Sequence, residues 1–327
     1  MDLTPSNRHG PPYLPGTPAV SLPVADPGPT VPDSEPIPGN RAAPRDAASA
    51  PSVEIVVLNY NGWPDTLRCL DSLEQLSYPR ARIVVVDNHS TDDSVAQLKQ
   101  RHPELELVDT GTNLGFAGGN NVGIRRAMSR GAAYVWLLNN DATADPESLT
   151  ALVRTAEADS RVGAVGSVIY EQAIPAQVQA RGGGRVCLAS GHCRNVRTPD
   201  QAPNFITGTS LLLRVRALED VGLLDERFFF LWEDVDLSLR LTGHGWRLAV
   251  APQARVWHRG GGTEPRISPW RIEHHAAGLV LLMRKHARLP WLSVLPIWSY
   301  YAYLSVRHGS PTIIARAMRG WLRGWRL

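Results

Sequence analysis

The first half of the chain alternates between short apolar runs and segments whose apolar residues recur at helical spacing. In the run Tyr134–Leu138, five apolar residues stop abruptly at the polar cluster Asn139–Asp141. A short apolar run with a polar end indicates a strand buried in a parallel sheet. The same pattern predicts strands at 53–58, 82–87, 105–108, 162–170 and 205–213, with shorter ones at 246–250 and 254–257.

Helices are predicted between these strands. Pro64 is followed by Leu67, Leu70 and Leu73 at helical spacing, and further helices are expected after residues 93, 121, 145 and 236. Residues 171–203 are predicted to form a variable loop. Strand and helix alternate at intervals of about thirty residues, which is typical of βαβ units with right-handed crossovers. The fold class is therefore predicted as α/β, with a Rossmann-like, mostly parallel sheet covered by helices on both faces.

Composition divides the chain into three parts. Residues 1–51 hold half of the 26 prolines and almost no periodic apolar pattern, so we expect a disordered tail. Residues 52–265 carry the α/β pattern, and residues 266–327 form a basic, Trp-bearing helical extension. The extension has a net charge of +9, whereas residues 1–265 carry −6. Because the α/β part is acidic and its aromatic residues are not interleaved with basic ones, a nucleic-acid partner is excluded.

The extension is predicted to lie on an anionic membrane surface. Its last helix places five apolar residues on one face and its arginines largely off it; the apolar residues are Ile314, Met318, Trp321, Leu322 and Trp325. A basic amphipathic helix with Trp at its edge is typical of an interfacial anchor. A core helix or an oligomer interface is the alternative. Residues 289–306 lack charge, but Pro290 and Pro296 argue against a clean membrane span.

The cysteines and the N-terminus indicate a cytoplasmic location. Three cysteines are too few for a disulfide scaffold, so a reducing compartment is expected. The first residues show no apolar core of a signal peptide.

Acidic residues stand at the ends of several predicted elements. Asp141 ends a predicted strand, and ligands of open α/β sheets bind beyond the carboxyl ends of the strands. A carboxylate there suits Mg²⁺ or Mn²⁺, although an Asn/Asp turn that caps the next helix is the alternative. Asp87 and the cluster 233–236 are the other acidic positions, and the Gly115–Gly119 backbone allows close approach of a diphosphate.

Six motifs in this order resemble a known family. They are Val56–Asn61, Val86–Asp92, Asn113–Asn121, Leu137–Asp141, Phe229–Asp236 and Val256–His258. Over residues 53 to about 288 the chain resembles an inverting glycosyltransferase of family 2 with the GT-A fold, and within it the bacterial rhamnosyltransferase-like group. The resemblance implies an enzyme that moves a sugar from a nucleoside diphosphate to an acceptor hydroxyl, with 52–265 as its catalytic domain.

The resemblance also implies a divalent cation, Mg²⁺ or Mn²⁺, at Asp141 and His258. Such a cation stabilises the charge that accumulates on the leaving diphosphate. Asp141 matches the last acid of the family's Asp-x-Asp motif, whereas the first position is the neutral Asn139. A purely structural histidine is the alternative for His258.

Asp234 matches the family's general base, which removes the acceptor proton, with Glu233 and Asp236 in support. A helix N-cap is the alternative role for this cluster. The residues that the resemblance assigns to the nucleotide sugar are Asn59, Tyr60, Asn61, Asp87, Asn113, Gly115, Asn120, Asn121, Asn139 and Asn140. Turn chemistry alone is the alternative for the asparagines.

The predicted reaction is transfer of a sugar to a cell-envelope glycan or lipid-linked acceptor at the inner face of the cell membrane. The group favours rhamnose from dTDP-rhamnose, followed by UDP-sugars. Two other functions remain open. A nucleotidyltransferase acting on sugar phosphates usually has a basic Gly-rich segment near the first strand, which 59–62 lacks, and an inactive nucleotide-sugar-binding module is opposed by the intact Asp141, Asp234 and His258.

Overall fold

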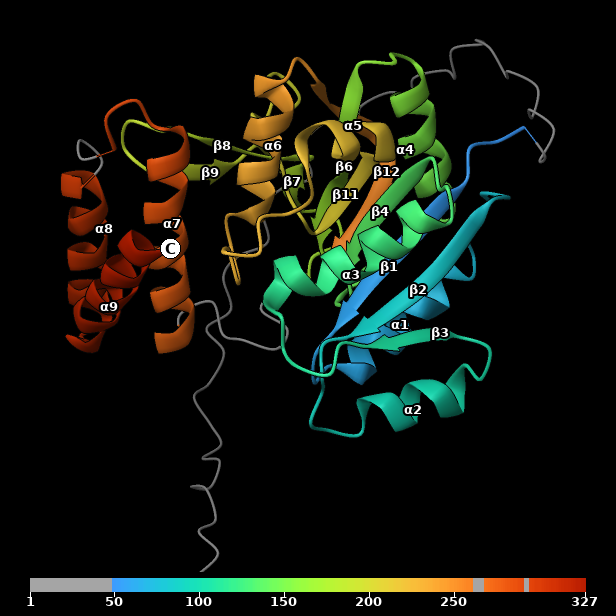
Figure 1. Cartoon of the computed structure of the whole chain (residues 1–327), viewed down its shortest axis with the longest axis horizontal. Coiled ribbons are helices and arrows are strands. Elements are labelled where there is room, and N and C mark those ends of the chain that lie inside the picture. The colour runs from blue at the N-terminus through green and yellow to red at the C-terminus, as the bar shows by residue number, and fades with distance from the viewer. Residues whose placement is uncertain (1–48, 261–267, 291–293) are drawn as a thin grey trace, which may run out of the picture. The chain divides into compact units, whose positions relative to one another are not determined.

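The first half of the domain has the predicted alternation of strands and helices. A computed structural model of the chain describes residues 49–260, 268–290 and 294–327, so nearly all of the predicted tail 1–51 lies outside the described residues. The alternating elements are β1 (Val53–Asn59), α1 (Trp63–Leu73), β2 (Ala81–Asp87), α2 (Ser94–Arg101), β3 (Glu106–Asp109), α3 (Gly115–Ser129) and β4 (Tyr134–Asn139). The four strands pair in parallel in the order β4-β1-β2-β3 (Figure 1).

The second half of the sheet is mixed. Its elements are β5 (Ala142–Ala144), α4 (Ser148–Glu157), β6 (Val162–Glu171), β10 (Phe205–Ile206), β11 (Ser210–Arg214), α5 (Val215–Val221), α6 (Glu233–Gly243) and β12 (Arg247–His258). β11 is antiparallel to both β4 and β6, and β12 is parallel to β6 but antiparallel to β5. Parallel pairing is therefore confirmed among the first four strands and between β6 and β12, whereas the other pairs of this half are antiparallel.

Helices cover both faces of the sheet, as predicted. Val53, Ile55 and Val57 of β1 pack with apolar side chains of α1, α2 and α4, whereas Val56 packs on the other face with α3, α5 and α6. α3 lies unusually close to β1, because a Cβ on Gly123 would come 2.4 Å from Cγ1 of Val56. This short approach holds the start of α3 at the carboxyl edge of the sheet.

The prediction of a loop over 171–203 is wrong. This segment contains β7 (Val178–Arg181), β8 (Gly183–Val186) and β9 (Cys193–Asn195), which extend the sheet beyond β6. Each strand is too short to show a period, and Gly183 lies so close to β10 that a Cβ would come 2.1 Å from the Phe205 carbonyl oxygen. The predicted strand 205–213 is interrupted at 207–209, α5 was not predicted, and the two strands predicted over 246–257 are one irregular strand. The helix expected after residue 121 is α3, which already begins at Gly115.

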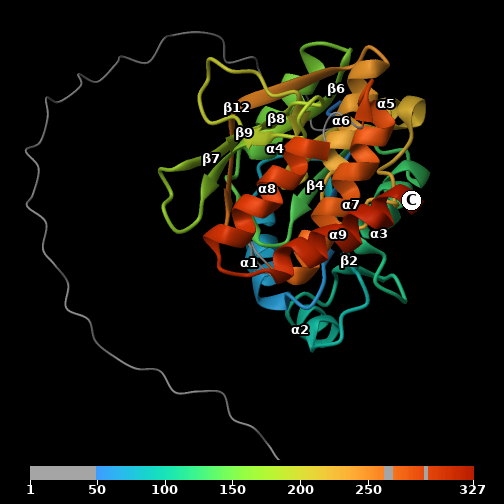
Figure 2. The same cartoon turned by 90° about the vertical axis from the view of Figure 1, so that its left-hand side faces the viewer.

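Three C-terminal helices form a group of their own: α7 (Pro269–His286), α8 (Val294–Arg307) and α9 (Thr312–Arg326) (Figures 1 and 2). α9 crosses α7 at its two glycines, where a Cβ on Gly320 or Gly324 would come 2.1 Å or 2.5 Å from the carbonyl oxygens of Glu273 and Ala277. Within the described ranges we find no helix with the length and apolar content that crossing a bilayer requires.

Candidate active site

The carboxyl ends of β1 and β2 are joined by a buried polar cluster. Asn59 pairs with Asp87 in the strand register, and its Nδ2 donates to Oδ1 of Asp87 at 2.7 Å. The hydroxyl and the backbone N–H of Ser90 also donate to this carboxylate, at 2.7 Å and 2.8 Å. Thr66 donates to Oδ1 of Asn59 at 2.7 Å. Asp87 is only 1% exposed, so in this structure its carboxylate organises the loop after β2.

Asn61 joins the loop after β1 to the loop after β2 on the exposed side of this cluster. Its φ of 49° lies in the left-handed region that asparagine tolerates better than most residues. There its Oδ1 accepts from the Thr91 backbone N–H at 2.8 Å. Tyr60, between Asn59 and Asn61, is half-buried at this edge.

Asn88 holds the glycine-rich loop that opens α3. Its Nδ2 donates to Oδ1 of Asn113 at 3.0 Å and to the Gly115 carbonyl oxygen at 3.1 Å, and its Oδ1 accepts from the Leu114 N–H at 2.9 Å. Gly115 has a φ of +73°, and a Cβ there would come 2.2 Å from the carbonyl oxygen of Phe229. Only glycine satisfies both conditions. The N–H of Phe116 donates to the same Phe229 oxygen at 2.7 Å, which binds the segment before α6 to the start of α3.

Asn120 and Asn121 are buried within α3. Nδ2 of Asn120 donates to the Phe116 carbonyl oxygen at 2.9 Å. Asn121 bonds to both backbone groups of Leu224. It donates to the carbonyl oxygen at 2.8 Å and accepts from the N–H at 3.1 Å. Both side chains are at most 2% exposed, so in this structure they hold protein segments, and the ligand contact expected of them stays a prediction.

Asp141 and His258 meet at the end of β12. β12 pairs His258 with Ala142, and this register brings Nε2 of His258 to 3.1 Å from Oδ1 of Asp141. Nδ2 of Asn139 lies 3.4 Å from the same nitrogen, whereas Asn140 turns away and donates to the Thr66 hydroxyl at 3.0 Å. The Asp141 and His258 side chains are 9% and 12% exposed.

This pair fits one divalent cation. Two neighbouring ligands of an octahedral ion with bonds of about 2.1 Å are about 3 Å apart, which matches the observed separation. Burial raises the pKa of Asp141, but its contact with His258 lowers it more, so the ligating carboxylate form is favoured. Among the described residues, no three His, Cys, Asp or Glu side chains gather as a metal site. A cation held by this pair would need further ligands beyond the two side chains.

The acids of α6 follow a strained turn. Leu231 and Trp232 have φ values of 72° and 78°, which is uncommon for large side chains and typical of functional sites. Asp234 accepts from the N–H groups of Gly208 and Val235 at 2.9 Å and 2.8 Å. Burial nevertheless raises its pKa, because desolvation outweighs these hydrogen bonds.

Glu233 is more deeply buried than Asp234. Its Oε2 has no hydrogen-bond partner among the described residues. Burial and the neighbouring Asp234 charge raise the pKa of Glu233 well above its usual value. The two backbone N–H groups on Asp234, which Glu233 Oε2 lacks, stabilise the charged form of Asp234.

Comparison with known proteins decides the family. The family described as Glycosyl transferase family 2 matches residues 54–222, more than half of the 327 residues. The chain belongs to glycosyltransferase family 2. The match includes the glycine-rich loop, Asp87 and Asp141.

Relatives of this glycosyltransferase extend the likeness beyond the matched span. N-acetylglucosaminyl-diphospho-decaprenol L-rhamnosyltransferase of Mycobacterium tuberculosis is 30% identical over 279 residues, covering 77% of this chain and 90% of that protein. The dTDP-rhamnosyl transferase RfbF of Shigella flexneri is 23% identical over 251 residues, covering 72% and 81%. The structure resembles the mannosyltransferase PcManGT of Pyrobaculum calidifontis, solved with GDP-Man and Mn²⁺, with a TM-score of 0.56 at 18% identity over 86% and 88% of the two chains. The predicted GT-A fold is thus confirmed.

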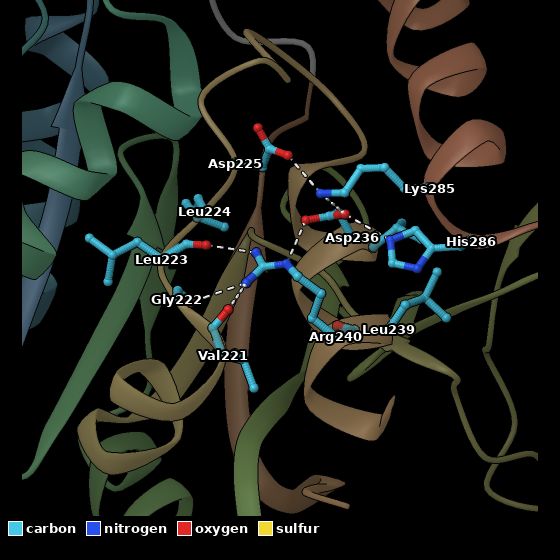
Figure 3. A network of polar contacts seen from close by, with 12 residues as sticks. Val221, Gly222, Leu223, Leu224, Asp225, Asp236, Leu239, Arg240, Lys285 and His286 are labelled. Atoms are coloured by element: carbon cyan, nitrogen blue, oxygen red, sulfur yellow. Dashed lines mark hydrogen bonds and ion pairs between the residues drawn. The ribbon is translucent and has the colours of Figure 1, made fainter. Parts of the chain in front are cut away.

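In this glycosyltransferase the side chain of Asp236 makes its contacts on the side of α6 that faces α7, apart from Asp234. Its side chain is fully buried, and its carboxylate contacts Arg240 at 2.8 Å, Lys285 at 2.6 Å and His286 at 2.8 Å (Figure 3). Arg240 also donates to the carbonyl oxygens of Val221, Gly222 and Leu223. Asp236 therefore ties α6 to the end of α7 and to the loop after α5.

Sequence reasoning missed several residues that organise the site. Asn88 and Ser90 lie inside a motif that it used, but nothing in the pattern distinguishes them from ordinary turn residues. Lys285 and His286 lie on the helix that the resemblance places after the catalytic domain, and nothing in the pattern links them to Asp236. Gln179, whose side chain reaches His258, lies in the segment predicted as a loop.

We predict that Asp236→Asn destabilises the protein by about 3 kcal/mol near neutral pH, because it leaves the partly buried Arg240 and Lys285 incompletely paired. Burial raises the pKa of Asp236, but His286, Lys285 and Arg240 lower it more. A carboxylate whose folded pKa is depressed contributes its full stability above its unfolded pKa, about 3.9, and loses it as the pH falls through the folded value. The difference between wild type and variant should therefore shrink below about pH 4.

Urea denaturation over a pH series measures both effects. Asp71→Asn, which changes an exposed aspartate of α1, is the matched control and should leave stability nearly unchanged at every pH. A deficit of Asp236→Asn that stays constant into acid would contradict the assigned ion pairs.

Proposed function

We propose that the chain transfers a sugar, with inversion, from a nucleoside diphosphate to a hydroxyl of a lipid-linked or cell-envelope glycan acceptor. Residues 52–265 are the proposed catalytic domain. One observation carries the proposal: a candidate cation pair and a candidate base are attached to the same end of β4. Asn139, at that end, donates its backbone N–H to Thr209 at 3.0 Å, and the preceding Gly208 donates to Asp234. Asp141 follows this end of β4, and Asp234 is bonded to the segment that pairs with it, so both acids are held next to the same strand end.

The proposed donor is dTDP-rhamnose, with UDP-sugars as the second choice. Two relatives are named rhamnosyltransferases, and one of their names includes dTDP. The proposed acceptor is a sugar carried on a polyprenyl diphosphate, because the name of the Mycobacterium tuberculosis relative contains such a compound. The nucleotide would contact the loops after β1 and β2, which Asn59, Asn61 and Asp87 hold together.

Asp141 and His258 would hold the divalent cation, for which Mn²⁺ in the Pyrobaculum calidifontis structure is a precedent. When bound, such a cation offsets the negative charge that develops on the departing diphosphate. The Gly115 backbone, which Asn88 and Asn113 orient, would face the same diphosphate.

Asp234 is the proposed general base. As the acceptor oxygen attacks the anomeric carbon and the bond to the diphosphate breaks, the hydroxyl proton passes to this carboxylate. The raised pKa of Asp234 brings its basicity closer to working pH, and a protonated Glu233 beside it avoids two adjacent buried charges. Asp236, whose oxygens are occupied by cations, is proposed to position α6 rather than to react.

Metal-dependent nucleotide binding is the first expected result. We expect dTDP with Mn²⁺ or Mg²⁺ to raise the melting temperature, and either component alone to have a smaller effect, because a ligand of the folded state stabilises by mass action. Differential scanning fluorimetry against dTDP, UDP, GDP and nucleoside triphosphates identifies the nucleotide. Stabilisation by triphosphates alone would favour a nucleotidyltransferase, and no shift with any nucleotide would favour an inactive scaffold.

Replacement of the proposed base should stop turnover but not binding. Asp234→Asn should lower kcat by about 10²- to 10⁴-fold and leave the shift by dTDP with metal unchanged. The acid limb of the wild-type pH–rate profile should lie above the pKa of an ordinary aspartate, because burial raises that of Asp234. Sugar transfer to a polyprenyl-diphosphate acceptor is the assay, and Glu219→Gln, an exposed acid of α5, is the control. Near-normal turnover of Asp234→Asn would disprove the assignment.

We also propose that residues 266–327 form an extension that binds the inner face of the cell membrane through α9. Its buried face, Ile313, Ala317, Gly320 and Gly324, packs on α7. A second apolar stripe on α9 is between 40% and 49% exposed and consists of Ile314, Met318, Leu322 and Trp325. Exposed arginines at 319 and 326 flank the stripe, which suits anionic headgroups. The enzyme would then bind a lipid-linked acceptor at the membrane surface that carries it.

The full-length protein should sediment with vesicles containing phosphatidylglycerol, and less so at high salt. Met318→Glu combined with Leu322→Glu should lower the bound fraction by about tenfold or more, since each buried apolar side chain contributes about 1.5–3 kcal/mol. Ile174→Glu, at an apolar residue of the catalytic domain that is 56% exposed, is the matched control. Equal sedimentation of both variants would argue against α9 as the contact.

A further inference from the structure

Gln179 lies at an irregularity of β7 that directs its side chain. β6 pairs Ile169 with Ala180 and Tyr170 with Val178, so Gln179 is the extra residue of a β-bulge. Bulges often re-aim a side chain beside an active site. Nδ2 of Asn195, on β9, donates to the backbone oxygen of Gln179 at 3.2 Å and holds the bulge from the other side.

The side chain of Gln179 reaches His258, 79 positions further along the chain. Oε1 of Gln179 lies 2.8 Å from Nδ1 of His258, and the contact is partly buried. β6 lies between the two strands that carry these residues, pairing with β7 along one edge and with β12 along the other. The contact therefore depends on the order of three strands.

This contact favours a hydrogen on one particular ring nitrogen of His258. An amide oxygen only accepts, so Nδ1 carries the hydrogen and donates it to Gln179. In the neutral ring, Nε2 then has a lone pair. The amide of Asn139, whose Nδ2 lies 3.4 Å from Nε2, is placed to donate weakly to that lone pair.

The lone pair of Nε2 points at a second electron-rich atom. Oδ1 of Asp141 lies 3.1 Å away, and two lone pairs at this distance repel each other unless a cation or a proton lies between them. The Gln179 contact thus prepares the His258–Asp141 pair to receive a cation. Outer partners of metal-bound histidines commonly act in this way, and their loss typically weakens metal affinity by about 10- to 100-fold.

We propose that Gln179 is a positioning residue that fixes the Nδ1–H tautomer of His258 and so presents Nε2, together with Asp141, to the divalent cation. The proposal rests on the proposed function for its use of the cation, but its structural part concerns the metal-free protein. Gln179 itself touches neither the cation nor the substrate. Its neutral amide orients the imidazole without adding charge to the site.

The first experiment reads the tautomer directly, without metal or nucleotide. Long-range ¹H–¹⁵N spectra of histidine-labelled protein at alkaline pH distinguish Nδ1–H from Nε2–H, and His258→Asn identifies the His258 signals among the ten histidines. Wild type should show Nδ1–H. Gln179→Leu, which keeps the bulk but removes the acceptor, should shift His258 towards Nε2–H, and Gln179→Glu should retain Nδ1–H.

The second experiment measures Mn²⁺ binding by electron paramagnetic resonance in the presence of dTDP or UDP. Gln179→Leu should weaken Mn²⁺ affinity by about tenfold or more, and Gln179→Glu should restore it. Gln177→Leu, at an exposed glutamine in the turn before β7, is the matched control and should bind as wild type does. Melting temperatures of all variants identify any effect due to unfolding.

The outcomes separate this inference from the function on which it rests. An Nε2–H tautomer in wild type, or a tautomer and Mn²⁺ affinity unchanged in folded Gln179→Leu, would overturn the role of Gln179. A Gln179-dependent Nδ1–H tautomer in a protein that binds no Mn²⁺ with either nucleotide would support the orientation of His258 but overturn the cation site and, with it, the metal-dependent function.

Discussion

The parallel register of β1 with its two neighbours determines where the candidate site lies. Asn59 pairs with Asp87 on one side, and Leu58 pairs with Asn139 on the other, so three loops leave the sheet at the same level. Parallel strands that end together leave their last backbone groups and polar side chains at one edge, where a ligand can bind. A one-residue slip of β1 would turn every side chain of the strand to the opposite face. The apolar packing on both faces of β1 opposes that slip.

The loops at this edge are held by polar side chains rather than by apolar packing. Asn61, Asn88 and Asn121 each bond to the backbone of a neighbouring segment, and each is an amide that donates and accepts at once. The buried amides of Asn88 and Asn121 orient their segments, because an unpaired buried amide would cost free energy. Several asparagines that resemble ligand contacts in the sequence therefore support the loops whose backbone would meet the ligand.

Three successive acids of α6 occupy three different environments. Glu233 is buried with an unpartnered oxygen, Asp234 accepts from two backbone N–H groups, and Asp236 is surrounded by cations from α6 and α7. The pKa values of Glu233 and Asp234 are raised and that of Asp236 is lowered, so the electrostatic surroundings separate their roles. The contacts of Asp236 also show how α7, outside the α/β sheet, orients the helix that carries the proposed base.

The sequence by itself determined the parallel half of the fold, the family and the approximate bounds of the first four strands. Continuous apolar runs and helical spacing are local features, and the acids at the strand ends identify the edge where Asp87 and Asp141 lie. It did not determine the strands of 171–203, because they are short and contain glycine, so they show no alternating apolar pattern. Only the tertiary structure decided that Asp236 binds Lys285 and His286, and that Gln179 reaches His258 across β6. These contacts depend on strand order and helix packing, which leave no periodic pattern in the residues that make them.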